Sequence, residues 1–363
     1  MTQFERAPRI VVIGGGIAGL SCAAAVSEGA SVTVLEAESQ PGYHASGRSA
    51  AVYIEPYINA TVHALTCASL PHHLAHGAKP IGDWMIADAE HAHLLDDYLE
   101  TWRPLCPELH EIDPSQVRRT VPILREESVA RVVADPHTRA LDVHRLLEGY
   151  RRQLLANGGA LRGNARVEHL ERRSGQWKVS FGAETLMADI VVNAAGAWGD
   201  AVGQLAGAEP LGLTPYRRTA LMIDPGQSVY GWPMVHKVEG GLYFKPDAGV
   251  LMVSLVDATA SPPCDAQPDE WDLAVLIDRF EAATVVSVQR PGRAWAGLRT
   301  FLPDQIPAVG FDPLVPDFFW LVGQGGFGVQ TAPALSTVAA ALLTGHQHAL
   351  ADGLDPARFA VAR

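Results

Sequence analysis

Apolar and polar residues alternate along this chain in short blocks, and the first two apolar blocks flank a helix-like stretch. The β-branched block 11–13 runs into the glycine-rich turn Gly14–Gly19. An alanine-rich stretch follows, and a second β-branched block, 31–35, ends at Glu36. Such blocks predict buried strands, and the alanine-rich stretch predicts a helix. The pattern therefore predicts a strand–helix–strand unit over residues 11–36.

Similar blocks return later in the chain and predict two sheets. The first group of expected strands is 167–170, 177–181, 190–193 and 318–322. We expect 190–193 and 318–322 to rejoin the sheet that begins at residue 11. The second group, expected in an inserted domain, is 220–223, 242–245 and 250–255. Helices are expected at 61–76, 91–102, 142–156, 270–280 and 333–343, and a loop that enters a helix is expected at 41–51.

These elements predict an α/β fold, in which a Rossmann-like dinucleotide-binding domain carries an inserted α+β domain with an antiparallel sheet for the substrate. The nucleotide-binding domain is expected to be discontinuous. It comprises residues 1–80, 140–215 and 298–363, and the inserted domain comprises 81–139 and 216–297.

The turn Gly14–Gly19 fits the G-x-G-x-x-G pattern of a dinucleotide site. Gly14 permits the tight turn, Gly16 lets the backbone approach a pyrophosphate, and Gly19 lets helix and strand pack closely. The phosphates would then meet the helix N-terminus. Glu36 would accept the ribose hydroxyls of an adenosine, and its charge disfavours the 2′-phosphate of NADP. FAD or NAD is therefore the expected nucleotide.

A second G-x-G-x-x-G pattern, Gly323–Gly328, precedes the helix expected at 333–343. No strand that ends in an acidic residue follows about 20 residues later, so the ribose-binding half of an NAD site is missing. We interpret this turn as a helix N-terminus directed at the electron-rich ring of a reduced flavin, because free N–H groups stabilise negative charge. With one nucleotide fold, FAD is the expected cofactor and an organic substrate is its reductant.

Composition and charge exclude several other classes of function. A net charge of −12 leaves no broad basic surface, so a nucleic-acid partner is not expected. Four cysteines stand far apart without a C-x-x-C pair, which favours a reducing cytoplasm. No uncharged run is long enough to span a bilayer, so we expect a cytoplasmic protein, with peripheral attachment to the inner membrane left open. His72, His73 and His76 lack nearby carboxylates in sequence, so no metal site is expected.

Five motifs together resemble one family of flavoproteins. They are Gly-Arg-Ser-Ala-Ala at 47–51, Val-Asn-Ala-Ala-Gly-Ala-Trp at 192–198, Tyr-Phe-Lys-Pro-Asp-Ala-Gly at 243–249, Ala-Gly-Leu-Arg at 296–299 and Gln-Gly-Gly-Phe-Gly-Val-Gln-Thr at 324–331. In content and order they resemble the FAD-dependent D-amino-acid oxidase and glycine oxidase superfamily, most closely the bacterial D-arginine dehydrogenases. The resemblance runs nearly end to end. Some relatives attach the flavin covalently, but no cysteine follows Cys264 here, so noncovalent FAD is expected.

The resemblance implies that two arginines bind the carboxylate of an amino-acid substrate. One is Arg299, and the other is Arg218, with Arg217 as the alternative. A planar guanidinium can bind a carboxylate through two parallel hydrogen bonds. Tyr243 resembles the family's carboxylate-side tyrosine, and Tyr57 resembles the active-site tyrosine of a mobile loop.

The residues implied to contact FAD lie in the two glycine-rich turns, in segment 36–51 and around the strand 190–193. They are Gly14, Gly16, Ile17, Ala18, Gly19, Glu36, Ala37, His44, Ala45, Ser46, Gly47, Arg48, Ser49, Ala50, Ala51, Val167, Ala194, Ala195, Gly196, Trp198, Arg299, Gly325, Gly326, Phe327, Gly328, Val329, Gln330 and Thr331. Gly326 would also offer its carbonyl oxygen to the substrate amine.

Two departures from the D-arginine dehydrogenase pattern affect the expected substrate. Trp84 stands where those enzymes place an acidic residue against the substrate guanidinium, and Val52 stands where they have a histidine. Both changes remove polarity, so neutral, apolar or aromatic D-amino acids are the expected substrates. A shift by one residue would put Asp83 in the place of Trp84 and restore a carboxylate.

The implied reaction is oxidative deamination, in which hydride passes from the α-carbon to flavin N5 and the imine gives a 2-oxo acid and ammonia. A secondary-amine oxidase for sarcosine, glycine or proline-like substrates remains an alternative. A 2-hydroxy-acid dehydrogenase would need a base that no histidine clearly supplies, and a noncatalytic assembly factor would bind FAD without turnover. The sequence leaves open whether oxygen, a quinone or a redox protein accepts the electrons, and leaves open the oligomeric state.

Overall fold

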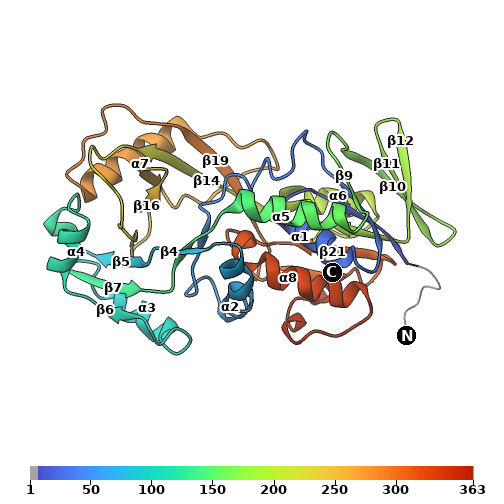
Figure 1. Ribbon diagram of the computed structural model, residues 1–363, viewed down its shortest axis with the longest axis horizontal. Helices are drawn as coiled ribbons and strands as arrows, with labels where there is room; N and C mark the ends of the chain where they lie inside the picture. The colour runs from blue at the N-terminus through green and yellow to red at the C-terminus, as the bar shows by residue number, and fades with distance from the viewer. Residues whose placement is uncertain (1–6, 363) are drawn as a thin grey trace.

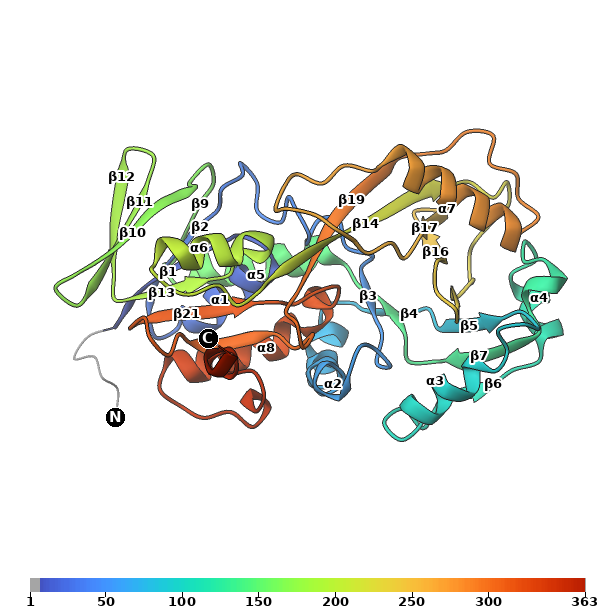
Figure 2. The ribbon, with the colours of Figure 1, turned by 180° about the vertical axis from the view of Figure 1, so that it is seen from behind.

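Two large sheets dominate the computed structural model, which describes residues 7–362 (Figure 1). A six-stranded sheet lies toward one end of the elongated molecule, and a nine-stranded sheet lies toward the other (Figure 2). Helices pack on both sheets. This mixed arrangement confirms the α/β fold class predicted from the sequence.

The six-stranded sheet has the order β20–β21–β13–β1–β2–β9. Its members are β1 (Arg9–Ile13), β2 (Ser31–Leu35), β9 (Ala160–Arg162), β13 (Ile190–Asn193), β20 (Ala308–Phe311) and β21 (Phe318–Val322). Neighbouring strands are parallel except for β20 and β21. As predicted, β13 and β21 rejoin the sheet that begins with β1. Their β-branched and aromatic runs are buried on both faces, as in other parallel sheets.

Alternate residues of β1 enter two different cores. Ile10 and Val12 pack with α1 (Ile17–Val26), α5 (Val143–Ala156) and α8 (Gly328–Leu343). Val11 and Ile13 face the opposite side, where a three-stranded sheet and α6 (Gly199–Leu205) cover the sheet. The three strands are β10 (Val167–Arg173), β11 (Gln176–Phe181) and β12 (Glu184–Ala188). The helix α2 (Ala60–Ala75) packs against α8.

The nine-stranded sheet has the order β18–β14–β17–β16–β15–β5–β7–β6, with β19 also paired to β14. Its members are β5 (Asp83–Ala87), β6 (His110–Glu111), β7 (Arg131–Asp135), β14 (Thr214–Ile223), β15 (Met234–Lys237), β16 (Tyr243–Asp247), β17 (Val250–Ser254), β18 (Thr259–Ala260) and β19 (Ala294–Phe301). Pairing is antiparallel except between β15 and β5. One face carries an apolar core covered by α4 (Pro114–Thr120) and α7 (Glu270–Ala283). On the other face, α3 (Leu94–Trp102) covers part of β5 and β7, and residues of β14, β16, β17 and β19 line a cavity.

Short elements complete the described chain. They are β3 (Val52–Tyr53), β4 (Lys79–Pro80), β8 (Arg139–Ala140), α3 (Leu94–Trp102) and the 3₁₀ turns Glu126–Ser128, Gly196–Trp198, Ala349–Ala351 and Pro356–Ala362. Within residues 7–362, no helix combines the length and the apolar character needed to cross a bilayer.

The structure corrects some predicted elements and boundaries. Residues 41–51 form turns that lead into the strand β3, not into a helix, because Gly42 and Ala51 both adopt positive φ. The helix expected from residue 333 begins at Gly328, directly after the glycine-rich turn. The domain division stays a prediction, and its expected boundaries 215/216 and 297/298 fall inside β14 and β19, whose full lengths the apolar pattern did not reveal.

Candidate functional site

A cavity of about 580 Å³ lies between the two large sheets. Its walls come from the carboxyl ends of β1, β2 and β13, from the N-termini of α1 and α8, and from β14, β16, β17 and β19. In open parallel sheets, ligands bind outside the carboxyl ends of the strands. The cavity therefore joins a nucleotide-binding edge to the face of the second sheet that lies opposite α7.

The glycines of the first turn are required by close backbone contacts. Gly14 has φ +109°, and a side chain there would overlap the carbonyl of Ala194 in the neighbouring strand segment. A side chain at Gly19 would overlap the carbonyl of Gly14. The amide of Ile17, at the start of α1, donates to Ser46 Oγ over 2.9 Å. The turn thus brings the helix N-terminus to the cavity, where it can meet an anion.

Glu36 lies at the end of β2 and is almost fully buried in the cavity wall. Its Oε2 accepts a hydrogen bond from the amide of Gly15 over 2.6 Å, and its Oε1 accepts one from the amide of Glu38 over 2.9 Å. A carboxylate held here fits the hydroxyls of an adenosine ribose and repels a 2′-phosphate.

The cavity has the space and the polar groups that a flavin nucleotide requires. A Cβ at Gly196, which lines the cavity, would meet no atom within 4 Å, so the backbone itself forms the wall there. A Cβ at Gly16 would contact only Ser46 Oγ, at 3.3 Å. Gln324 Nε2 is buried and has no hydrogen-bond partner among the described residues. The donor set and the open backbone therefore fit FAD.

Most of the residues implied to contact FAD lie on the cavity wall. These are Gly14, Gly16, Ile17, Ala18, Glu36, Ala37, His44, Ala45, Ser46, Arg48, Ser49, Ala50, Val167, Ala194, Ala195, Gly196, Trp198, Arg299, Gly325, Gly326, Gly328 and Val329. Those that lie behind the wall are Gly19, Gly47, Ala51, Phe327, Gln330 and Thr331. The Thr331 hydroxyl donates within α8 to Phe327 O, and Gln330 binds α2 and the strand β3 region, which corrects the expectation for these two side chains.

Two cations converge at the sheet end of the cavity. Arg218 of β14 and Arg299 of β19 both line it, and Arg299 Nη1 donates to the hydroxyl of Tyr57 over 3.3 Å. Burial, together with the charge of Arg299, lowers the pKa of Arg218 to about 10, so both side chains remain cations at neutral pH. Tyr243 of β16 lines the same region. A Cβ on Gly326 would meet Arg299 Cζ at 2.9 Å, so the turn before α8 packs directly on this guanidinium.

Asp257 fixes Arg218 in place. Arg218 Nε donates to Asp257 O over 2.6 Å, and the Asp257 carboxylate accepts from the amide and hydroxyl of Thr219. The alternative, Arg217, points to the opposite face of β14 and pairs with Asp272 of α7 over 2.8 Å. The alternation of side chains along the strand therefore brings Arg218, and not Arg217, to the cavity.

The structure corrects the expectations for Trp84 and Val52. Trp84 packs in the apolar core under α7, on the face of β5 away from the cavity, and Val52 packs beside the cavity wall without lining it. The register favours the neighbouring residue, because Asp83 faces the site side of the sheet. Its Oδ1 lies 2.8 Å from His236 Nδ1, and the His236 ring lies 5.0 Å from the Tyr243 ring.

Apart from Arg218, Tyr243 and Arg299, sequence reasoning missed most residues on the sheet side of the site. The cavity wall also includes Tyr43, Ala220, Met252, Cys264, Gly297, Leu298 and Thr300. Leu298 and Thr300 flank the predicted Arg299 in β19, so recognising a strand at 294–301 would have indicated part of this wall. The Asp83–His236 pair joins residues 153 positions apart, and no local sequence pattern predicts it.

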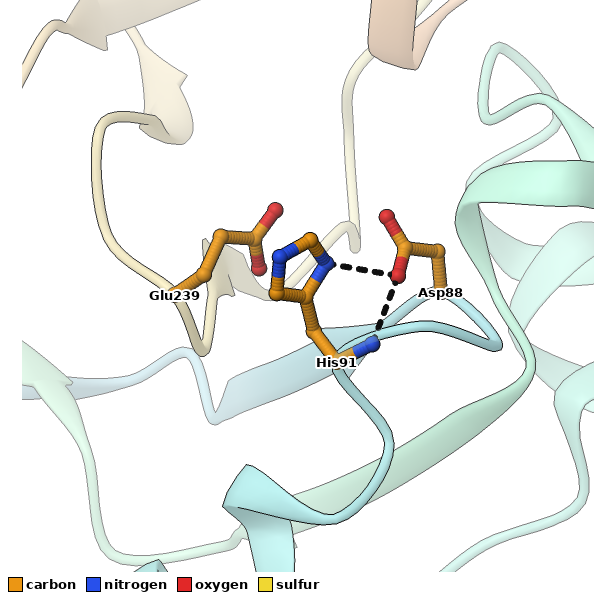
Figure 3. Close-up of side chains that lie close together, drawn as sticks. All are labelled: Asp88, His91 and Glu239. Atoms are coloured by element: carbon orange, nitrogen blue, oxygen red, sulfur yellow. Dashed lines mark hydrogen bonds and ion pairs between the residues drawn. The ribbon is translucent and has the colours of Figure 1, made fainter.

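Histidine clusters outside the cavity have partners of their own. His73 Nε2 lies 2.8 Å from Gln330 O, and the His72 ring stacks on Tyr150. Elsewhere, ligand atoms of Asp88, His91 and Glu239 lie within 4.8 Å of one another (Figure 3). The ammonium of Lys237 pairs with both carboxylates, so this cluster already contains its cation.

The structure thus combines a strand–turn–helix nucleotide site with a cavity lined by two arginines. The model of the DAO family, described as FAD dependent oxidoreductase, matches residues 9–342. The chain belongs to this family, and FAD is its cofactor.

Two solved structures share the fold across almost the whole chain. L-proline dehydrogenase from P. horikoshii is 22% identical with a TM-score of 0.86 and matches 99% of this chain and 100% of that chain. Glycine oxidase from Geobacillus kaustophilus is 19% identical with a TM-score of 0.84 and matches 97% of this chain and 99% of that chain.

Curated relatives are longer proteins. The tRNA 5-methylaminomethyl-2-thiouridine biosynthesis bifunctional protein MnmC of Thiobacillus denitrificans is 32% identical over 391 aligned positions, which cover 99% of this chain and 61% of that protein. FAD-dependent oxidoreductase domain-containing protein 1 of Bos taurus is 27% identical over 312, covering 74% of this chain and 63% of that protein. The chain thus spans about six-tenths of the length of these relatives.

Proposed function

We propose that this FAD-dependent oxidoreductase oxidises the Cα–N bond of neutral amino acids, with D-amino acids as the main substrates. The observation that carries the proposal is the convergence of Arg218 and Arg299 at the sheet end of the cavity. The Asp257 carboxylate balances only one of the two charges. A buried cation without a counter-ion costs free energy, so an anionic ligand would bind favourably beside the two arginines. The carboxylate of an amino-acid substrate is such an anion.

The chain's own residues would position the substrate rather than react with it. The two guanidiniums, with Tyr57 and Tyr243, would hold the carboxylate, and the carbonyl of Gly326 would accept an N–H of the amine. Bound FAD supplies the acceptor for the α-hydrogen and its electron pair. The nitrogen lone pair then forms the C=N bond, and water converts the imine to a 2-oxo acid and ammonia. Positioning of this kind accounts for much of the rate of such reactions.

Apolar residues that the second sheet contributes to the cavity wall, and not Trp84, support a preference for neutral side chains. Ala220 and Met252 line the cavity on the face that carries Arg218 and Tyr243, and they offer apolar contact without charge. The D configuration is supported by the motif resemblance to D-arginine dehydrogenases. The four free cysteines support the cytoplasm as the compartment.

A secondary-amine substrate is the second candidate. The carboxylates on the cavity wall, Glu36, Glu38 and Glu168, lie toward the nucleotide end, so the substrate nitrogen would meet a carbonyl and no carboxylate. A single carbonyl acceptor suits a nitrogen that keeps one N–H. L-proline dehydrogenase, which shares the fold, is named for a substrate whose nitrogen is a secondary amine.

Anaerobic reduction of the bound flavin tests the proposal. The purified yellow protein would be mixed with single D-amino acids, their L-enantiomers, sarcosine, D- and L-proline, 2-hydroxy acids, and amines that lack the carboxylate. Loss of the flavin absorbance band with neutral D-amino acids, and none with the decarboxylated amines, is the expected result.

Other outcomes would point to different functions. Faster bleaching by sarcosine or proline would favour the secondary-amine candidate, and bleaching by 2-hydroxy acids alone would overturn amine oxidation. If decarboxylated amines reduced the flavin as fast as amino acids did, the arginine argument would be wrong. FAD that no compound bleaches would favour a noncatalytic role.

A further inference from the structure

The Tyr243 ring depends on packing for its orientation. Its hydroxyl makes no hydrogen bond with any described residue, and only 5% of the residue's surface is exposed. The ring lies in a buried cluster with Ala220, Met234 and Met252. On its other flank lies the His236 ring, with 5.0 Å between the ring centroids and an interplanar angle of 41°.

Among these neighbours, His236 is the one whose side chain is fixed by a polar contact of its own. Methionine side chains have three rotatable bonds and adapt readily to their surroundings, so Met234 and Met252 define the ring position weakly. The imidazole, in contrast, is anchored by the 2.8 Å contact between its Nδ1 and Asp83 Oδ1. Asp83 is only 3% exposed.

Three neighbouring strands bring these residues to one face of the nine-stranded sheet. His236 of β15 stands directly opposite Tyr243 of β16. Met234, two residues earlier on the same face, stands opposite Asp83 of the parallel strand β5. Side chains two positions apart along a strand point to the same side, so Asp83 lies diagonally beneath His236 and can reach its ring.

The buried carboxyl group of Asp83 requires a hydrogen-bond donor at this position, because another carboxyl group faces it across the strand pair. Asp135 of β7 stands directly opposite Asp83, and like charges facing each other across a strand pair are unfavourable. Burial raises the pKa of Asp135, and the nearby Asp83 and Glu55 add to this shift, while hydrogen bonds from the Thr138 hydroxyl and the His137 amide oppose it. His236 is then the hydrogen-bond donor that satisfies Asp83, and breaking this contact would leave a buried carboxylate unpaired.

We propose that Asp83 and His236 form a positioning pair that holds Tyr243 against Arg218 and Arg299 for binding of the substrate carboxylate. The inference rests on the proposed function, because it takes Tyr243 as a partner of that carboxylate. It explains why a hydrogen-bonded Asp–His pair lies beside a cavity whose wall it does not itself form. The pair acts through Tyr243, so its removal is expected to weaken binding more than the chemical step.

A double-mutant cycle tests this coupling. Asp83→Asn keeps the size of the side chain but removes its charge, and Tyr243→Phe removes the hydroxyl. Three quantities would be measured in the FAD-loaded protein. These are KM and kcat with the best substrate found by flavin reduction, and the Kd of benzoate, a carboxylate that is not oxidised, from the shift of the flavin spectrum.

Asp83→Asn is expected to raise KM and the benzoate Kd by about three- to tenfold, with kcat nearly unchanged. In the Tyr243→Phe background, it should have little further effect, because the two changes act on one interaction. Asp88→Asn is the matched control. Asp88 makes the same 2.8 Å contact with His91 Nδ1 at the other end of β5 (Figure 3), away from the cavity, so its loss should leave KM and Kd unchanged.

Several results would overturn the inference. Additive effects in the cycle, or an Asp83→Asn protein with normal KM and Kd, would show that the pair does not act through Tyr243. If Asp83→Asn failed to fold, His236→Asn would replace it, since the amide can still donate to Asp83 while the ring contact with Tyr243 is lost. An unchanged Kd in that variant would also overturn the pairing. Benzoate binding separates the two proposals, because the cycle can be read even if no amino acid reduces the flavin.

Discussion

At the scale of single residues, the site holds two arginine cations and, among the described residues, only one carboxylate that pairs with them, that of Asp257. Arg218 and Arg299 approach each other on adjacent strands, where Arg218 stands next to Gly297 and Tyr216 stands next to Arg299. Two cations placed so close repel each other, and this repulsion contributes to the lowered pKa of Arg218. The fold tolerates the arrangement because Asp257 anchors one guanidinium and Tyr57 contacts the other. Binding of an anion would relieve the remaining excess charge.

Replacing Arg218, which lines the cavity, should therefore reduce activity far more than replacing its neighbour Arg217. Arg218→Gln is expected to lower kcat/KM for the carboxylate substrate by about 10- to 100-fold, because a charge-assisted hydrogen bond contributes about 1.5–3 kcal/mol. Arg217→Gln is the matched control, since Arg217 pairs with Asp272 on the far face. Steady-state kinetics of the two variants would provide the comparison. Equal losses would mean that Arg218 has no special role in substrate binding.

At the scale of elements, Gln330 joins α8 to α2 and to the segment that carries Tyr57. Its amide oxygen accepts from the amide of Ile54, and its amide nitrogen donates to Ile54 O and to the Thr66 hydroxyl. Gln330→Ala would leave the buried Thr66 hydroxyl and two partly buried backbone groups of Ile54 unpaired, so a loss of about 2–5 kcal/mol in the free energy of unfolding is expected. Thr337→Ala, on the same helix but partly exposed, should cost little. Urea unfolding of both variants measures the difference, and equal stabilities would contradict the role of Gln330.

The end of α2 gives the protein a predictable dependence on pH. Burial, together with the charges of His76 and His73, lowers the pKa of His72 to about 4, and burial also lowers the pKa of His73. The unfolded chain therefore binds more protons than the folded chain once the pH falls below about 6.5, the ordinary histidine value. The stability of the neutral imidazoles is fully present above that pH and is lost as the pH falls toward 4.

Thermal unfolding between pH 7 and pH 5 checks this dependence. The melting temperature should fall by several degrees in the wild type and by less in His72→Phe, which keeps a ring to stack on Tyr150 but cannot titrate. His110, an exposed residue, provides the control, and His110→Asn should keep the wild-type slope. A His72→Phe slope as steep as that of the wild type would assign the acid sensitivity to other groups.

How far the sequence predicts these elements depends on the strength of local patterns. The β1–α1–β2 unit and β21 were predictable because fully buried strands are uniformly apolar, and the glycines of the first turn have few alternatives. The strands β5, β7 and β19 mix polar and apolar residues, because one face of the second sheet packs in an apolar core and the other carries buried or partly buried charged groups such as Asp83, Asp135 and Arg299. The Trp84 expectation failed for the same reason. In a strand, a shift by one residue exchanges the two faces, and no local signal determined which of Asp83 and Trp84 faced inward.

At the scale of the whole molecule, the cavity lies where the two large sheets meet, so both sheets contribute to one binding site. The first sheet supplies the glycine-rich turn, Glu36 and the helix N-termini, and the second supplies the arginines and Tyr243. A ligand that contacts both sheets is bound only when both are folded and correctly placed. Binding of FAD should therefore stabilise the molecule as a unit, in proportion to the logarithm of its concentration.

Thermal unfolding of the protein stripped of FAD, followed by titration with FAD, tests this linkage. At 100 times the dissociation constant, bound FAD is expected to add about 2.7 kcal/mol to the free energy of unfolding, and NADP at the same concentration should add none.

Gly19→Ala should abolish the stabilisation by FAD, because the new Cβ would overlap the carbonyl of Gly14 and push α1 away from β1. Gly29→Ala is the matched control, since Gly29 follows the same helix and a Cβ there meets no atom within 4 Å. A Gly19→Ala protein that binds FAD normally would show that close packing of α1 on β1 is not required for the nucleotide site. Equal stabilisation by NADP would instead show that the charge of Glu36 does not select the nucleotide.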